Sequence, residues 1–203
     1  MRILIACERS GIVREAFRRR GHDAWSCDLE PAEDDSPWHI RADVLRVIDA
    51  CASDEWGLMI AHPECRYLSV SGLHWNHRRP ERAALTERAV EFATALWDAP
   101  IARVALENPV GLLSSRIRKP DQIIQPYDFG EDASKATCLW LRGLPPLRPT
   151  QRVPGRMING RERWANQTDS GQNRLGPSPT RSMDRARTYP GIADAMAEQW
   201  GRS

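Results

Sequence analysis

The stretch RILIACERSGIVREAFRRRGHDAWSCD, residues 2–28, predicts a strand, a helix and a second strand. It opens on a short apolar run, RILIA, and then places Ile12, Ala16 and Phe17 at helical spacing before Gly21 ends the pattern. The run DAWSC follows as another short strand. Two strands joined by a helix pair in parallel, because the crossover returns the chain to the same end of the sheet.

The same alternation continues through the first half of the chain. Its longest helical pattern begins at Pro80 and places Leu85, Ala89, Phe92 and Leu96 on one face. Strands that alternate with helices predict an α/β fold with a doubly wound, mostly parallel, Rossmann-like sheet. The predicted strands are residues 2–6, 23–27, 56–61 and 101–107, and the predicted helices are residues 11–21, 44–52 and 81–97.

Length and composition favour one domain. A chain of 203 residues, 41% of them hydrophobic, can bury a single sizeable core. Many of the 15 prolines fall after residue 120, where PPLRPTQRVPG and LGPSPTR have the composition of loops. We therefore expect an irregular C-terminal third over a regular first half.

Charge and cysteine content limit the partners and the compartment. The formal net charge is only +2, so a polyanion must be met by local clusters of charge. The N-terminus lacks the apolar length of a signal sequence, and no later run approaches the roughly 20 residues that span a bilayer, which predicts a cytoplasmic protein. No Cys-x-x-Cys pair occurs, so free thiols are expected at Cys7, Cys27, Cys51, Cys65 and Cys138.

One part of the expected sheet edge has the features of a cofactor site. Asp28 stands about 20 residues past the first strand turn, where an acid accepts hydrogen bonds from ribose hydroxyls. The turn CERSG has one glycine and no G-x-G-x-x-G, which favours a ligand without phosphate, and S-adenosylmethionine fits. Asp43 could bind the adenine amino group or cap the following helix, and both alternatives stay open. The expected cofactor contacts are Cys7, Glu8, Ser10, Gly11, Asp28, Leu29, Asp43, His62 and Pro63.

The neighbouring strand ends carry a thiol and an acid. Cys65 follows the strand WGLMIA, and Glu107 ends the strand IARVALE. A thiolate is a strong carbon nucleophile when its pKa is lowered, and a strand end that leads toward a helix can supply the required field. Asn108 follows the acid, and the ring of Pro109 helps to fix the turn. A thiol and an acid that face one cofactor indicate chemistry on an electron-poor ring.

The ordered segments ACERSG, CDLEP, AHPEC, LENPVG, KATCLWLRGLPPL and TYPGIADAMAEQWG resemble the small, phage-type branch of the DNA cytosine-C5 methyltransferase family. The resemblance covers nearly the whole chain. Pro63 and Cys65 resemble the family's nucleophile loop, and LENP resembles its Glu-Asn-Val element. The last segment resembles a helix that packs back beside the cofactor. The resemblance implies one methyltransferase domain, with an α/β core at 1–142, a loop-rich, substrate-facing segment at 143–187 and a returning helix at 188–203.

The resemblance also implies a mechanism and a set of site residues. Cys65 adds to C6 of cytosine while Glu107 acts at N3, and the target base is flipped out of duplex DNA or lies in a single strand. The family's Gln-x-Arg-x-Arg element, which places an arginine on the base, has its nearest match at QNR, which makes Arg174 the candidate. Asn108, Pro109 and Arg66 would contact the substrate. The resemblance implies a protein of the bacterial cytoplasm or of the cytoplasm of a phage-infected host. The sequence leaves open whether the protein is a homodimer.

Several features depart from the family pattern, and one is that the first motif lacks the usual Phe-x-Gly-x-Gly glycines. Glu64 replaces its second proline, and this carboxylate opposes thiolate formation unless Arg66 or another cation offsets it. Family members that read a sequence have a long recognition domain before the last helix, whereas only residues 145–187 are available here. Sequence readout is then short, supplied by a partner, or absent.

Three alternative interpretations stay open at this stage. His62, Cys65, His74 and His77 are four candidate zinc ligands within 16 residues. A non-catalytic nucleic-acid-binding protein would use the arginines and Trp164 of RVPGRMINGRERW and TRSMDRAR. The same thiol and acid could also modify C5 of a free pyrimidine nucleotide, or transfer another group from the sulfonium.

Overall fold

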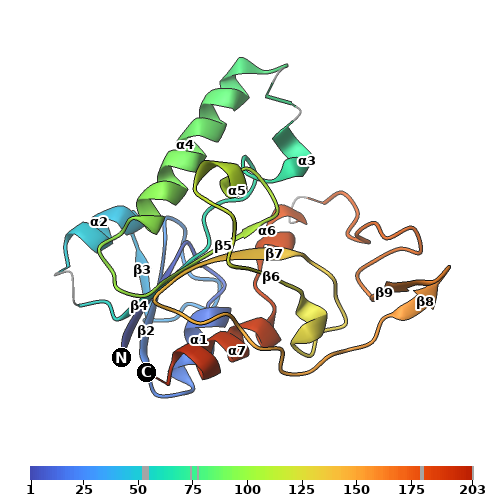
Figure 1. Ribbon diagram of the computed structural model, residues 1–203. Coiled ribbons are helices and arrows are strands. Elements are labelled where there is room, and N and C mark those ends of the chain that lie inside the picture. The colour runs from blue at the N-terminus through green and yellow to red at the C-terminus, as the bar shows by residue number, and fades with distance from the viewer. Residues whose placement is uncertain (52–54, 74, 77, 179–180, 203) are drawn as a thin grey trace.

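Strands and helices alternate along most of the chain in the computed structural model, which describes residues 1–51, 55–73, 75–76, 78–178 and 181–202 (Figure 1). The strands are β1 (Arg2–Ala6), β2 (Asp23–Asp28), β3 (His39–Arg41), β4 (Leu58–Ala61), β5 (Val104–Pro109), β6 (Gln122–Ile124), β7 (Thr137–Arg142), β8 (Arg156–Ile158) and β9 (Arg161–Arg163). The α-helices are α1 (Ile12–Arg18), α2 (Val44–Asp49), α3 (Val70–Leu73), α4 (Pro80–Trp97), α5 (Leu113–Arg116), α6 (Arg181–Ala186) and α7 (Pro190–Trp200), and one 3₁₀ turn, η1, covers Pro126–Asp128.

Seven of the described strands form one sheet in the order β3-β2-β1-β4-β5-β7-β6. Strands β1 to β5 pair in parallel with one another, whereas β7 is antiparallel to both β5 and β6. The chain leaves β1 toward β2 and later returns to place β4 on the other side of β1. The switch point of this doubly wound sheet therefore lies between β1 and β4, and ligands bind beside the strand ends at such a point. The expected doubly wound, mostly parallel, Rossmann-like sheet is confirmed.

The sheet is buried on both faces because successive side chains of a strand point to opposite sides. Ile3 and Ile5 pack into a cluster with side chains of α1 and α7, whereas Leu4 and Ala6 pack into a second cluster with side chains of α2 and α4. Helices α1 and α7 lie side by side on their face of the sheet (Figure 1). Trp200 of α7 is buried in the first cluster, and its indole N–H donates to the Pro145 carbonyl at 2.9 Å.

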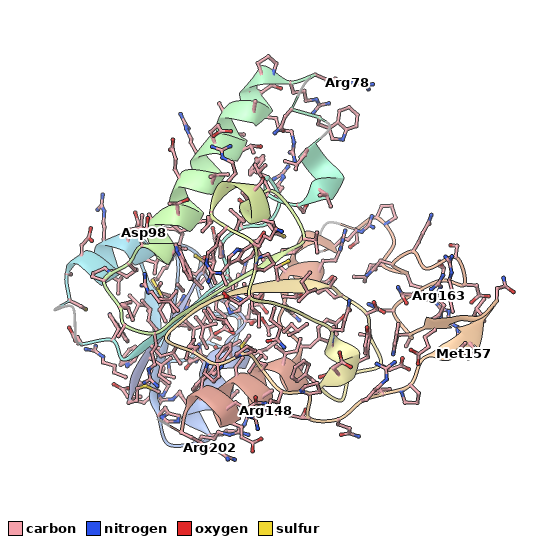
Figure 2. The ribbon with its side chains drawn as sticks, in the orientation of Figure 1. Arg78, Asp98, Arg148, Met157, Arg163 and Arg202 are labelled. Atoms are coloured by element: carbon pink, nitrogen blue, oxygen red, sulfur yellow. The ribbon has the colours of Figure 1, made fainter. Side chains whose placement is uncertain are left out.

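Helix α4 buries most of the predicted face, since Leu96 is buried and Ala89 and Phe92 pack partly buried against the second cluster, but it does not bury the first part of that face. The predicted face included Leu85, which is 38% exposed, whereas Thr86 and Val90 are buried. Figure 2 shows α4 extending from near Asp98 outward to near Arg78, so its first turns project beyond the sheet. There it contacts the segment after α3, since the Asn76 amide donates to the Thr86 hydroxyl at 3.0 Å. Pattern alone does not show where a helix leaves the sheet that it covers.

The fourth predicted strand is displaced by a few residues. The prediction was residues 101–107, whereas β5 covers Val104–Pro109, so Glu107 and Asn108 lie within the strand rather than after it. The reason is pairing with β7, which extends in antiparallel register from Val104 to Pro109.

The C-terminal third is mostly irregular, as predicted. Between β7 and α6, the described residues form one regular piece, the hairpin β8–β9. Asn159 and Gly160 connect its strands with φ angles of 49° and 73°, the left-handed conformations of a two-residue hairpin turn. Across the described part of the chain, no helix has both the length and the apolar character needed to cross a membrane.

Candidate active site

A cleft of about 830 Å³ opens beside the carboxyl ends of β4 and β5. Its walls come from the turns after these strands, from the segment before β7 and from the C-terminal region. A second hollow, of about 450 Å³, lies near His22 and Arg202, among none of the predicted site residues. The larger cleft is lined by His62, Pro63, Glu64, Cys65, Arg66, Ser69, Glu107, Asn108, Pro109, Ser134, Lys135, Ala136, Gln167, Gly171, Asn173, Leu175, Asp184, Arg185, Ala186 and Tyr189.

Cys65 and Glu107 come together at this cleft because β4 and β5 are adjacent parallel strands. Cys65 lies in a tight turn after β4, in which its carbonyl accepts hydrogen bonds from the Leu68 and Ser69 N–H groups at 3.1 and 3.0 Å. Glu107 is a buried residue near the end of β5. The thiol and the acid that the sequence singled out therefore face one cavity.

The expectation that the fold lowers the pKa of Cys65 is wrong. Burial raises the pKa of the Cys65 thiol, and the negative charge of Glu107 raises it further. No long helix begins at Cys65, since α3 has only four residues and starts at Val70. The cations that oppose this effect are Lys135 and Arg185 rather than Arg66. The free protein therefore holds Cys65 as a thiol at neutral pH.

Glu107 forms a buried pair with His62. The Nδ1 atom of His62 lies 3.0 Å from Oε2 of Glu107, and the two side chains are only 10% and 11% exposed. Burial raises the pKa of Glu107, but the hydrogen bond with His62 and the charge of Lys135 outweigh burial, so the pKa lies below its ordinary value. Glu107 is therefore a carboxylate at neutral pH.

Asn108 joins the end of β5 to the turn after β4. Its amide donates to the Pro63 carbonyl at 2.9 Å, while its Oδ1 atom is buried without a partner among the residues that the structure describes. The turns after these two strands meet where the Leu112 N–H donates to the Leu68 carbonyl at 2.8 Å. A Cβ on Gly111 would lie 2.1 Å from the Leu68 carbonyl oxygen. Only glycine allows this approach, which holds the Cys65 turn against the Glu107 strand.

Gly111→Ala is expected to lower the free energy of unfolding by about 1–3 kcal/mol, the range for forcing extra volume into a packed site. The neighbour is a backbone carbonyl, so it cannot rotate away. Urea unfolding measures the change. The matched control is Gly176→Ala, because no atom lies within 4 Å of the Cβ added there. Equal unfolding midpoints for Gly111→Ala and wild type would contradict the close approach.

The residues predicted for the cofactor form a separate group at the ends of β1 and β2. Asp28 ends β2, and its Oδ1 accepts the Glu30 N–H at 3.0 Å. Leu29 is 68% exposed. Cys7 has a φ angle of 59°, a strained conformation for a non-glycine residue, and burial raises the pKa of its thiol. Asp43 caps α2 by accepting the Leu45 N–H at 3.0 Å, which favours the capping alternative.

Glu8 and Ser10 stabilise the start of α1. The Glu8 carboxylate accepts hydrogen bonds from the Val13 N–H at 2.7 Å and the Arg14 N–H at 3.2 Å. The Ser10 hydroxyl donates to Glu8 at 3.3 Å. Burial raises the pKa of Glu8, so a proton on this carboxyl is favoured more than usual. Gly11, with a φ angle of 73°, is the N-cap of the helix.

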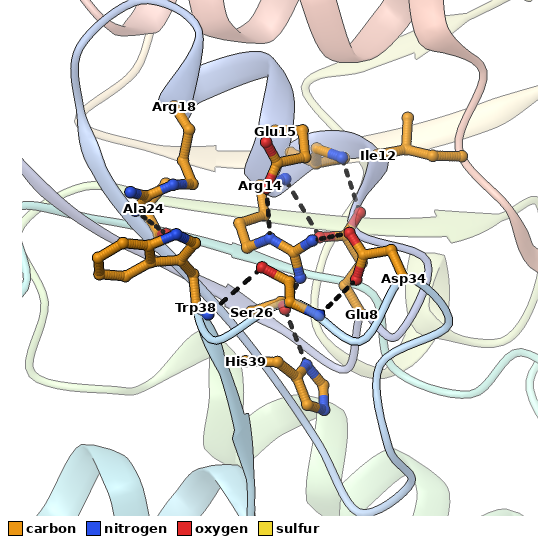
Figure 3. A network of polar contacts seen from close by, with 12 residues as sticks. Glu8, Ile12, Arg14, Glu15, Arg18, Ala24, Ser26, Asp34, Trp38 and His39 are labelled. Atoms are coloured by element: carbon orange, nitrogen blue, oxygen red, sulfur yellow. Dashed lines mark hydrogen bonds and ion pairs between the residues drawn. The ribbon is translucent and has the colours of Figure 1, made fainter.

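A buried arginine anchors the loop that follows β2 (Figure 3). Arg14 is fully buried, and its guanidinium donates to the Ser26 hydroxyl at 2.8 Å and pairs with Asp34 in the loop. Ser26 also contacts Nδ1 of His39 at 2.8 Å. Glu15 accepts a further hydrogen bond from Arg14 at 2.9 Å. The network holds the loop beside the expected cofactor edge. The sequence pattern did not reveal the network, because a charged residue in a helix is ordinarily expected to be exposed.

These residues fit an adenosine group better than a phosphate. Asp28 offers carboxylate oxygens for hydroxyl groups, and Leu29 offers an exposed apolar side chain for the face of a base. Arg9, the nearest cation of the first turn in sequence, pairs with Glu33 at 3.5 Å. His62 and Pro63, which were also predicted to bind the cofactor, line the larger cleft instead. His62 stands between the two regions, since its charge acts on Glu8 as well as on Glu107.

Arg174 does not line the cleft, although its neighbours Asn173 and Leu175 do. Its guanidinium donates to the Gln167 carbonyl at 2.8 Å. Lys135 lines the cleft instead, and its charge acts on both Cys65 and Glu107. Sequence reasoning missed Lys135 because KATCLWLRG was not recognised as an antiparallel strand. Once β7 pairs with β5 in antiparallel register, Lys135, which precedes β7, must lie beside the carboxyl end of β5.

The C-terminal arginines act mainly within the protein. Trp164 is buried and stacks on Tyr127 with ring centroids 3.9 Å apart, so it is not available to stack on a base. Arg152 pairs with two carboxylates, and Arg156 pairs with Asp169 at 3.0 Å. This weakens the alternative of a non-catalytic nucleic-acid-binding segment.

The zinc alternative gains no support from the described residues, among which no group of three or more His, Cys, Asp or Glu side chains could hold a metal ion. His74 and His77 lie outside the described residues. The Nδ1 atom of His62 is already engaged by Glu107.

No protein-family model matches the chain, and no curated protein matches it. Among solved structures, a proposed DNA modification methyltransferase encoded within an E. coli prophage is 12% identical, with a TM-score of 0.49 over 79% of this chain and 53% of its own. S. pombe Dnmt2 methyltransferase is 16% identical, with a TM-score of 0.41 over 70% and 50%. A mutant of Spodoptera frugiperda DNMT2 is 14% identical, with a TM-score of 0.44 over 75% and 54%. The chain spans about half the length of each structure.

Proposed function

We propose that this protein transfers a methyl group from S-adenosylmethionine to C5 of cytosine in DNA through a covalent adduct on Cys65. The observation that carries the proposal is the convergence of Cys65 and Glu107 on one cleft, beside the switch point of a doubly wound sheet. A nucleophile and an acid that face the same cavity can act on opposite sides of one polar ring.

The chemistry assigns each residue a step. Sγ of Cys65 bonds to C6 of the cytosine ring, and the Cys65 thiol must lose its proton for this to happen. Charge that develops on the ring is stabilised at N3 through Glu107, which is a buried residue. Once C5 has taken up a methyl group, loss of the C5 proton to a base allows the bond between Sγ and C6 to break, which restores Cys65.

S-adenosylmethionine, when bound, supplies the electrophilic methyl group that C5 takes up. Asp28 would hold its ribose hydroxyls, and Leu29 would contact its adenine. The turn beside the adenosine group would be formed by Cys7, Glu8, Ser10 and Gly11. In this turn, Glu8 fixes the start of α1.

Asp28→Ala is expected to weaken binding of S-adenosylmethionine by about 1–3 kcal/mol, because polar groups in the pocket lose their partner. Titration calorimetry measures this change. The neighbouring exposed residue provides a control, since Glu30→Ala should leave the affinity unchanged. The same affinity for Asp28→Ala and wild type would remove Asp28 from the cofactor site.

A rim of arginine and aromatic side chains beside the cleft supports nucleic acid as the substrate. Arg66 lines the cleft and lies over the ring of Tyr67 at 5.6 Å, and Arg82 lies over the same ring at 5.0 Å. Arg82 also donates to the Arg66 carbonyl at 2.9 Å, which ties the Cys65 turn to the start of α4. Arginine next to an aromatic ring suits contact with phosphate and base together.

A second group of arginine and aromatic side chains lies at the outer end of α4, around Trp75, which is 41% exposed. Arg78 and Arg79 lie 5.8 and 5.3 Å from the centre of its ring system. Both arginines are exposed at the outer end of α4, where Figure 2 labels Arg78. A strand whose base enters the cleft could follow both groups with its backbone, which favours DNA over a free nucleotide.

The substrate alternatives are separated by label transfer. Protein and S-adenosylmethionine with a tritiated methyl group are incubated with cytosine-containing DNA, the matching RNA and dCTP in separate reactions. Label in DNA alone is the expected result. Label in dCTP alone would make the protein a nucleotide-modifying enzyme, and DNA binding without any transfer would make it a binding protein.

A further inference from the structure

His62 and Glu107 form a rigid, buried pair in the wall of the cleft. The His62 N–H donates to the Ala6 carbonyl at 3.0 Å, so its backbone continues the pairing of β4 with β1. Glu107 pairs in register with β7 on its other side. Both partners of the 3.0 Å contact are therefore held by the sheet and not by a flexible loop.

The second nitrogen of His62 has a separate significance. Its Nε2 atom is buried and has no partner among the described residues, although the side chain lines the cleft. Buried polar atoms are nearly always hydrogen-bonded, so this atom requires a partner from a ligand or from water. His62 thus joins the acid on one side to the substrate space on the other.

We propose that His62 is the proton partner of Glu107 and stores the proton that Glu107 delivers to N3 of the substrate ring. The inference rests on the proposed function. As the bond between Sγ of Cys65 and C6 forms, Nδ1 of the protonated His62 ring gives its proton to the Glu107 carboxylate, which passes a proton on to N3. When the bond to Cys65 breaks, the proton returns along the same path. No electron acceptor or further reactant is needed.

The charges around the pair explain why a store is needed. Burial raises the pKa of Glu107, but the hydrogen bond with His62 and the charge of Lys135 lower it more, so Glu107 alone holds no proton at neutral pH. A general acid must carry its proton at the working pH. Two ionisable groups this close titrate as a unit, and one proton can be shared between them. The groups that face the pair are Glu8 after β1, Cys65 after β4, Lys135 before β7 and Cys138 on β7.

The variant His62→Asn separates proton storage from positioning. Asparagine keeps a donor close to the place of Nδ1 but cannot give up a proton. We expect kcat at pH 8 to fall about 10²-fold, the effect of losing an acid–base group, and the loss to be smaller at an acidic pH, where a larger fraction of Glu107 carries its own proton. The matched control is His22→Asn, which lies in the distant hollow and should keep the wild-type pH profile. An equal loss at both pH values would show a structural role and overturn the inference.

A second measurement does not depend on activity. In protein labelled with ¹³C at the glutamate carboxyl carbons, the Glu107 signal is assigned by its absence in Glu107→Gln. His62 lowers the pKa of Glu107, whereas burial raises it. Without the charge of His62, the titration midpoint of Glu107 should therefore rise in His62→Asn. An unchanged midpoint would overturn the inference even if the protein methylates DNA. If the midpoint rises but the protein methylates nothing, the pairing of His62 with Glu107 stands and the proposed function is rejected.

Discussion

Cys65→Ser is expected to abolish a covalent complex that the wild-type protein forms with DNA carrying 5-fluorocytosine. Fluorine at C5 cannot leave as a cation, so the bond between Sγ and C6 persists after methyl transfer, and the complex resists denaturant. A serine hydroxyl is far less ionised than a thiol at neutral pH, even though burial and Glu107 raise the pKa of Cys65. Denaturing gel electrophoresis with and without S-adenosylmethionine measures the complex.

The other cysteines provide the control for this experiment. Cys51 is a half-buried free thiol just after α2, so Cys51→Ser should leave the complex intact. Peptide mapping should place the nucleotide on Cys65. An adduct on a different cysteine, or methyl transfer by Cys65→Ser, would contradict the role of Cys65 as the nucleophile.

Glu107→Gln is expected to slow methyl transfer by about 10²-fold or more while DNA binding persists, because the amide keeps the shape but cannot exchange a proton. Single-turnover kinetics and fluorescence anisotropy measure the two quantities. The same variant should speed alkylation of Cys65 by iodoacetamide at pH 8, since the Glu107 charge that raises the pKa of the thiol is gone.

The two readouts of Glu107→Gln must move in opposite directions for the assignment to hold. Slower alkylation would mean that the two side chains do not interact as the structure places them. Transfer at the wild-type rate would leave Glu107 as a structural residue.

The placement of Cys65 and Glu107 on one edge could be predicted because buried parallel strands appear as continuous apolar runs. The carboxyl ends of such strands meet at the same edge, so the residues beside those ends become neighbours regardless of their separation in sequence. The structure places both residues on one cleft. The prediction needed only the parallel direction of the strands, not the details of the side chains.

The remaining features depend on tertiary partners that a local pattern does not contain. Arg14 is buried only because Ser26 and Asp34 reach it from distant segments. His62 could not be recognised as a partner of Glu107, 45 residues away, until β4 and β5 were in register. The pKa of Cys65 was wrongly expected to fall, because burial and the nearby carboxylate outweigh any local helix field.

The proposed activity is transfer of a methyl group to C5 of cytosine in DNA. Its most direct test is incubation of the purified protein with S-adenosylmethionine and DNA, followed by digestion and mass analysis of the nucleosides. The account predicts 5-methyl-2′-deoxycytidine, which is absent when Cys65→Ser replaces the wild-type protein. A methyl group on N4 of cytosine or on adenine, or a different group on C5, would contradict it.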